Sequence, residues 1–341
     1  MAERIALALG SGGARGYAHI GVINELRSRG YEIAGVAGSS MGAMVGGLFA
    51  AGSLDEFSQW ATTLTQRAVL RLLDPSISAA GVFRAGKILD AVREILGDAT
   101  IENLPIPYTA VTTDLIAGKS VWLQRGPVDE AIRASIAIPG IVAPHVLDGR
   151  LLADGGILDP LPIAPMAAVQ ADLTVGVSVS GMDSALDADD RDETEPRASR
   201  ERLNRLLRST TALLDRFSTA GEPGAPGLPA QPGAGREIAG VDAQAEIEAE
   251  IDDEVDAIDD GAAAALPKLG SFAVLNRTID IAQAALARHQ MAAYPPDLLI
   301  EVPRTACRSL DFHRAAELID LGHRLAAKAL DGLEDRGRES S

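Results

Sequence analysis

The sequence of 341 residues has little cysteine, few aromatic side chains and a deficit of positive charge. Because Cys307 is the single cysteine, no intramolecular disulfide can form, and a secreted fold held together by disulfides is excluded. The chain has 31 Lys and Arg against 48 Asp and Glu, a net charge of −17, which argues against a nucleic-acid partner. The hydrophobic share of 47% is still ample for a buried core.

The sequence also lacks the pattern of a signal peptide, because its first apolar residues run directly into glycines. The uncharged stretch at residues 33–54 is long enough to cross a bilayer. Gly and Ser crowd this stretch, however, and its middle is a turn motif, which favours a buried strand, turn and helix. The negative net charge also disfavours electrostatic attachment to anionic lipid, and we expect a cytoplasmic protein with at most transient contact with a membrane surface.

Apolar runs of strand length alternate with segments of helical spacing, which predicts an α/β fold with a mostly parallel central sheet flanked by helices. The predicted strands are residues 4–10, 33–38, 108–113, 120–123, 151–153, 173–179 and 297–302. The predicted helices are residues 17–29, 41–51, 85–96, 128–137, 272–291 and 311–333.

The acidity is concentrated in one segment. Residues 182–270 hold 21 acidic and 9 basic side chains, whereas the rest of the chain holds 27 and 22. Within this segment, residues 197–217 have the spacing of a basic amphipathic helix, and residues 221–235 have the composition of a linker. We expect residues 182–268 to be a largely disordered acidic insert that divides one catalytic core into residues 4–181 and 269–335.

A G-x-S-x-G pattern at residues 38–42 joins a predicted strand to an apolar helix. A nucleophile elbow needs this context, and its tight turn requires small residues such as Gly38 and Gly42 on either side. The pattern makes Ser40 the candidate nucleophile. The same residues are also compatible with an ordinary helix start that has Ser39 as its N-cap.

The glycine-rich loop at residues 10–16 follows the first predicted strand. It fails the dinucleotide fingerprint G-x-G-x-x-G in both registers, because Arg15 occupies a glycine position in one and Ser11 in the other. The alternative is an oxyanion hole, in which the backbone N–H groups of Gly12 and Gly13 face a developing negative charge.

The third motif, at residues 154–156, is an aspartate that leaves a short strand into two glycines. Alone it is compatible with an ordinary turn aspartate. A Ser–His–Asp triad also stays open, because His313 or His323 follows the serine and the aspartate in the order that α/β-hydrolases use. The sequence predicts helix packing for His19, and His145 could approach the site.

Together the three motifs resemble, in order and in spacing, the patatin-like phospholipase family. The stretches at residues 134–140 and 159–162 are also similar to that family. The resemblance covers residues 4–180 and, more faintly, 272–330. It is closest to the bacterial branch that resembles the catalytic domain of neuropathy target esterase. The loop departs from the family only at Ser11, where the family often has a third consecutive glycine.

The resemblance implies a patatin-like α/β/α fold with a Ser–Asp dyad. Ser40 would be the nucleophile and Asp154 its partner, with an oxyanion hole at Gly12 and Gly13. The residues implied to support these motifs are Gly10, Arg15, Gly16, Gly38, Gly42, Gly155 and Gly156.

The implied activity is hydrolysis of fatty acyl esters of phospholipids or lysophospholipids through an acyl-enzyme. Two alternatives stay open, a regulatory or scaffold protein that keeps the fold and a transacylase that uses the same dyad. The acidic run at residues 246–260 lacks the spacing of a calcium loop, so we expect no metal and no cofactor.

Overall fold

A computed structural model of the chain describes residues 2–72, 86–139, 141–181 and 271–339. The predicted acidic insert, residues 182–268, lies outside the described residues. So does the first residue of the helix predicted at residues 85–96.

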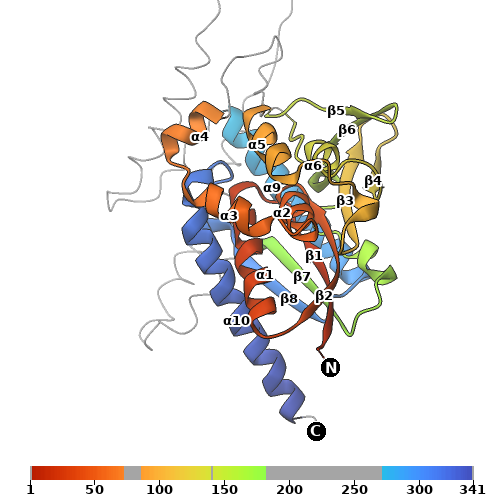
Figure 1. Ribbon diagram of the computed structural model, residues 1–341, viewed down its shortest axis with the longest axis vertical. Coiled ribbons are helices and arrows are strands. Elements are labelled where there is room, and N and C mark those ends of the chain that lie inside the picture. The colour runs from red at the N-terminus through yellow and green to blue at the C-terminus, as the bar shows by residue number, and fades with distance from the viewer. Residues whose placement is uncertain (1, 73–85, 140, 182–270, 340–341) are drawn as a thin grey trace, which may run out of the picture. The chain divides into compact units, whose positions relative to one another are not determined.

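The described residues form a single mixed sheet with the strand order β5-β6-β3-β2-β1-β7-β8, and β4 pairs with β3 beside this path (Figure 1). Five neighbouring strands, β3, β2, β1, β7 and β8, are parallel to one another. Strands β4 and β6 run antiparallel to β3. The mostly parallel sheet of the sequence prediction is therefore confirmed. The strands are β1 Arg4–Leu9, β2 Glu32–Ser39, β3 Tyr108–Asp114, β4 Lys119–Leu123, β5 His145–Leu147, β6 Arg150–Asp154, β7 Leu173–Gly181 and β8 Leu298–Pro303.

Strand β1 shows why helices cover both faces of this sheet. Successive side chains of a strand point to opposite faces. Ile5, Leu7 and Leu9 belong to the larger apolar cluster, which includes buried residues of α1, α2 and α10. Ala6 and Ala8 belong to a smaller cluster on the other face, where α9 and the segment at residues 161–169 pack. The helices are α1 Ala18–Ser28, α2 Met41–Ala50, α3 Leu54–Thr62, α4 Gln66–Leu72, α5 Gly86–Leu96, α6 Val128–Ser135, α9 Ser271–Ala293 and α10 Ala315–Glu339.

The segments on either side of residues 182–270 contribute to the same sheet. Strand β8 pairs in parallel with β7, and α10 packs along α1 (Figure 1). The uncharged stretch at residues 33–54 forms most of β2, the following turn and the buried helix α2, as its pattern predicts. Among the helices that the structure describes, none combines the length and the hydropathy of a membrane span.

The structure adds three elements that the sequence pattern did not predict: α3, α4 and β5. Helix α3 carries a readable signal, because Leu54, Phe57 and Ala61 are buried at helical spacing. Strand β5 pairs with β6 as a hairpin. It has only three residues, too few to show the alternation of apolar and polar side chains that predicts a strand. The predicted helix at 311–333 starts later, at Ala315, after the short 3₁₀ turn Phe312–Arg314, and it runs on to Glu339.

Candidate active site

Two strands end head to head beside β3 and bring Ser40 and Asp154 together. Strand β2 pairs with the first half of β3 and ends with Ser39 opposite Val111. Strand β6 pairs with the second half and ends with Asp154 opposite Thr112. Because β4 occupies the other edge of β3, the ends of β2 and β6 share one edge and face each other.

Ser40 stands in a strained turn between β2 and α2. Its backbone angles are φ 54° and ψ −122°, a left-handed conformation that is unusual for a residue with a side chain. A Cβ on Gly38 would lie 2.2 Å from the carbonyl oxygen of Gly42, and one on Gly42 would lie 2.2 Å from that of Leu9. Only glycine therefore fits on either side of Ser40, which is the geometry of a nucleophile elbow.

The Ser40 hydroxyl donates a hydrogen bond of 2.5 Å to Oδ2 of Asp154, and both residues are buried. The N–H of Gly156 donates to the other carboxylate oxygen at 2.7 Å. Burial raises the pKa of Asp154 to about 6, although the bonds from Ser40 and Gly156 oppose this rise. The carboxylate is thus a stronger base than an exposed aspartate and is still ionised at neutral pH.

Ser135, to which sequence reasoning gave no role, links the backbone of the elbow to strand β3 through two hydrogen bonds. Its hydroxyl accepts the N–H of Ser40 at 2.9 Å and donates to the carbonyl of Val111 at 2.6 Å. Ser135 lies at the end of α6, inside the stretch at 134–140 that resembles the patatin-like family. The resemblance of that stretch to the family was the only sequence signal near Ser135. It does not predict a hydrogen bond with Ser40, which lies 95 residues earlier in the chain.

The glycine-rich loop lies beside the elbow with two N–H groups unused. The N–H of Gly10 donates to Val177, that of Ser11 to Pro160 and that of Ala14 to Ser309. Within the described part of the chain, the N–H groups of Gly12 and Gly13 make no hydrogen bond. Gly13 has φ +55° and lines the same groove as Ser40, whereas Gly12 is the N-cap of the 3₁₀ helix Gly13–Tyr17.

The other motif residues pack the loops against one another. Arg15 is buried and does not line the groove; its Nη1 donates to the carbonyl of Arg304 at 3.2 Å, and its Nη2 pairs with Asp280 at 3.3 Å. A Cβ would collide at four further glycines, with the nearest atom at 2.1 to 2.9 Å. These glycines are Gly10, Gly16, Gly155 and Gly156.

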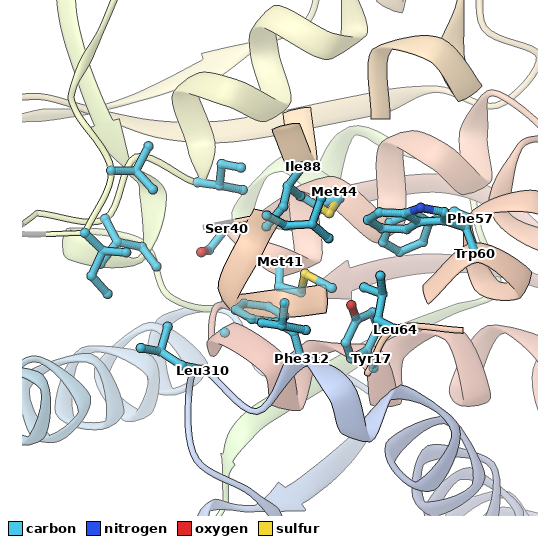
Figure 2. A pocket seen from close by; sticks show the side chains of 17 residues that line it. Tyr17, Ser40, Met41, Met44, Phe57, Trp60, Leu64, Ile88, Leu310 and Phe312 are labelled. Atoms are coloured by element: carbon cyan, nitrogen blue, oxygen red, sulfur yellow. The ribbon is translucent and has the colours of Figure 1, made fainter. Parts of the chain in front are cut away.

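The groove that holds Ser40 is otherwise apolar (Figure 2). It contains about 740 Å³ of space, counting its mouth toward solvent. Apart from Ser40 and the hydroxyl of Tyr17, its side chains are aliphatic, aromatic or methionine. It is lined by Gly13, Tyr17, Ser40, Met41, Met44, Phe57, Trp60, Leu64, Val69, Leu72, Ile88, Ile136, Ile138, Ile141, Val142, Leu310 and Phe312.

Each histidine whose contacts the structure gives has a partner outside the dyad. His19 is buried against the carbonyl of Gly10 at 2.8 Å, and burial lowers its pKa to about 4. His145 contacts Glu130 at 2.5 Å and Arg133 at 3.0 Å, and His323 pairs with Glu25 at 3.0 Å. Across the described residues, no histidine is hydrogen-bonded to Ser40 or Asp154, so the geometry favours a dyad over a triad.

No group of three or more His, Cys, Asp or Glu side chains that could hold a metal ion occurs in the described ranges. Cys307 is buried, and burial raises the pKa of its thiol to about 12. The thiol is therefore protonated at neutral pH and is a poor nucleophile or metal ligand.

Comparison with known proteins places the chain in a family. The patatin-like phospholipase family model matches residues 7–167. An uncharacterized NTE family protein of Mycobacterium tuberculosis is 61% identical, over 99% of this chain and 94% of that protein. A second such protein from that organism is 37% identical over 49% of this chain and 30% of its own length. Patatin-like phospholipase domain-containing protein 6 of Mus musculus is 32% identical over 52% of this chain and 14% of its own length.

The family match thus covers the elbow, the glycine-rich loop and Asp154, and the match with the first relative extends over the C-terminal helices as well. This chain belongs to the NTE family of patatin-like phospholipases.

Proposed function

We propose that this protein is a serine acyl hydrolase that cleaves fatty acyl esters of phospholipids or lysophospholipids through a Ser40–Asp154 dyad. The observation that carries the proposal is the 2.5 Å hydrogen bond between these side chains in an otherwise apolar groove. Membership of a patatin-like phospholipase family supports lipid hydrolysis in general.

In the first half of the reaction, the Ser40 hydroxyl attacks the ester carbonyl while its proton moves to Oδ2 of Asp154. The new Oγ–C bond converts the carbonyl oxygen into an oxyanion. The unused N–H groups of Gly12 and Gly13 are the candidate donors for it. When the C–O bond to the leaving alcohol breaks, protonated Asp154 returns the proton to that alcohol, and the acyl group stays on Ser40.

In the second half, water attacks the acyl-enzyme. Asp154 takes a proton from the water, the oxyanion forms at the same place, and the proton returns to Ser40 as the fatty acid leaves. A pKa of about 6 suits this exchange, because the carboxylate is ionised at pH 7 and its conjugate acid is strong enough to donate.

The apolar lining supports a fatty acyl chain as the group held in the groove. Side chains from α2, α3 and α4 line the groove, and Leu310 and Phe312 come from the segment before α10. Figure 2 shows Met41 and Met44 between Ser40 and the aromatic pair Phe57 and Trp60. Such a wall buries an acyl chain but offers a polar head group few hydrogen-bonding groups, chiefly the hydroxyls of Ser40 and Tyr17. We therefore assign the acyl chain to the groove and the head group to its mouth.

The test is labelling by a fluorophosphonate probe followed by hydrolysis of a panel of phospholipids, lysophospholipids and p-nitrophenyl esters. We expect the probe on Ser40 and release of fatty acid from at least one lipid. Failure of both labelling and turnover would favour a regulatory or scaffold protein. Labelling with acyl transfer to an added alcohol, but no fatty acid release, would favour a transacylase. The cytoplasmic location and the transient membrane contact stay predictions.

A further inference from the structure

Helix α9 presents polar side chains on the face that it turns toward the sheet. Asp280, Gln283, Ala287 and Gln290 follow one another at spacings of three, four and three residues, which places them on one face. Gln283 and Ala287 are buried, and Asp280 and Gln290 are partly buried. Buried polar side chains on a packing face cost free energy unless they make specific contacts.

Asp280 contacts the glycine-rich loop. Its carboxylate pairs with Nη2 of Arg15 at 3.3 Å, and the side chain of Arg15 is only 5% exposed. Arg15 follows Gly13 by two residues and also donates to the carbonyl of Arg304. Asp280 is thus the charged partner that holds this buried guanidinium in the loop of the candidate oxyanion donors.

Gln283 and Gln290 contact the loop of the aspartate motif. A Cβ on Gly156 would lie 2.6 Å from Nε2 of Gln283, so this amide fills the space beside Gly156. The N–H of Gly156 is the one that donates to Asp154. Two helical turns further along, Nε2 of Gln290 donates to the carbonyl of Leu158 at 3.0 Å.

Apolar contacts dock α9 independently of these polar ones. Ala287 and Met291 pack with Leu161, Ile163 and Met166 in the smaller apolar cluster. The helix therefore has a hydrophobic anchor at its C-terminal half, and its polar residues are available to position the two loops.

We infer that Asp280, Gln283 and Gln290 are positioning residues, through which α9 holds the glycine-rich loop and the aspartate loop at a fixed distance from each other. The two loops carry the candidate oxyanion donors and the base, respectively. This inference rests on the proposed function for its effect on rate, but the holding of the loops is measurable without it. Displacement of a reacting group by about 1 Å can reduce a rate by about 100-fold.

The test compares Asp280→Asn and Gln283→Met with the wild-type chain. For a p-nitrophenyl ester, we expect kcat to fall about 10- to 100-fold, with KM within about threefold of the wild-type value, because the groove itself is unchanged. Labelling of Ser40 by the fluorophosphonate should slow in parallel. Asp280→Glu should recover part of the rate.

Asp320→Asn is the matched control, because Asp320 pairs with Arg324 at 3.4 Å on the exposed surface of α10 and contacts neither loop. Hydrogen–deuterium exchange gives a readout that needs no activity. Peptides covering residues 10–17 and 154–159 should exchange faster in both α9 variants and at the wild-type rate in the control. Unchanged exchange, or a loss of kcat that only follows the unfolded fraction, would overturn the inference. A wild-type chain that neither labels nor turns over would instead refute the proposed function.

Discussion

At the scale of single residues, Ser39 and Ser40 are neighbours with different surroundings. Ser40 has the strained backbone, lines the groove and is bonded to Asp154. The hydroxyl of Ser39 is buried without a hydrogen-bond partner among the described residues, beside Gly155 on the sheet side of the turn. Only one of the two serines is therefore placed to react with an ester in the groove.

We expect Ser40→Ala to abolish esterase activity and fluorophosphonate labelling, because it removes the hydroxyl and leaves almost no cavity. Ser39→Ala should keep much of the activity, since Ser39 touches neither the groove nor the carboxylate. The measurements are labelling with mass spectrometry and circular dichroism of both variants. A label on Ser39 in the wild-type protein would show that the elbow assignment is wrong.

The second residue-scale prediction concerns Asp154. Its folded-state pKa of about 6 lies above the ordinary 3.8, so the folded state binds its proton more tightly than the unfolded state does. By linkage, its ionisation destabilises the fold increasingly from about pH 4 to pH 6, and the cost is constant above that range. Asp154→Asn should therefore raise the free energy of unfolding by about 1–3 kcal/mol at pH 8.

The same substitution should lower the rate by several orders of magnitude, as loss of a dyad member does. Denaturant unfolding of both proteins at pH 4 and pH 8 measures the stability effect, which should shrink at the lower pH. Single replacement of His145, His313 or His323 by Ala is the comparison for activity. A loss at one of these histidines as deep as at Asp154, with the fold intact, would favour a triad.

At the scale of elements, the turn from β2 into α2 requires glycine at positions where another part of the backbone lies too close for a Cβ atom. Gly42 opens α2 against the carbonyl of Leu9 in β1, so the elbow and the first strand are in direct contact. This contact links the position of Ser40 to the strand that leads into the glycine-rich loop. Helix α2 therefore cannot move away from β1 without opening the site.

Gly42→Ala should destabilise the fold by about 1–3 kcal/mol and reduce activity more strongly, because the added methyl collides with backbone at 2.2 Å. Gly332→Ala is the control, since Gly332 lies in α10 with no atom within 4 Å of an added Cβ. It should stabilise the fold by up to about 1 kcal/mol through helix propensity. Thermal unfolding and ester turnover measure both effects. If both variants had the same stability and the same activity, the proposed collision at Gly42 would be wrong.

Local signals in the sequence predict the elements that hold the motifs, but they do not predict the partners of those motifs. The elbow, the glycine-rich loop and the turn after β6 are each encoded within a few consecutive residues, and the structure brings their residues together. Ser135, Asp280 and Gln283 act through contacts with residues far away in the chain. Their sequence spacing is that of ordinary helix residues, so no local pattern distinguishes them.

At the scale of the whole molecule, the C-terminal segment completes the site that the N-terminal segment begins. The carbonyl of Ser309 accepts the N–H of Ala14 in the glycine-rich loop at 2.9 Å. Leu310 and Phe312 line the groove. The ring of Phe312 packs edge-on against the ring of Tyr17, with 6.1 Å between the ring centroids. The residues before 182 alone therefore lack part of the groove and part of the support of the loop.

Residues 182–268, by contrast, should be dispensable for hydrolysis of a small soluble ester, because none of the motif residues lies there. A chain that joins residue 181 to residue 270 through a short flexible linker should fold and hydrolyse a short-chain p-nitrophenyl ester near the wild-type rate. Circular dichroism and steady-state kinetics measure both properties. A folded but inactive protein would instead make this segment a lid or a part of the substrate channel.

The meeting of β2 and β6 beside β3 has a consequence for how this protein can diverge. Ser40 and Asp154 are 114 residues apart in the chain, yet their strands end at adjacent residues of β3. Insertions and deletions in α3, α4 or α5 would therefore reshape the groove without changing the distance between the two side chains. One residue inserted between Val111 and Thr112 would move them apart by about 3.3 Å, the rise per residue of a strand. Changes in the groove helices can thus alter the groove while β3 keeps the spacing of Ser40 and Asp154 constant.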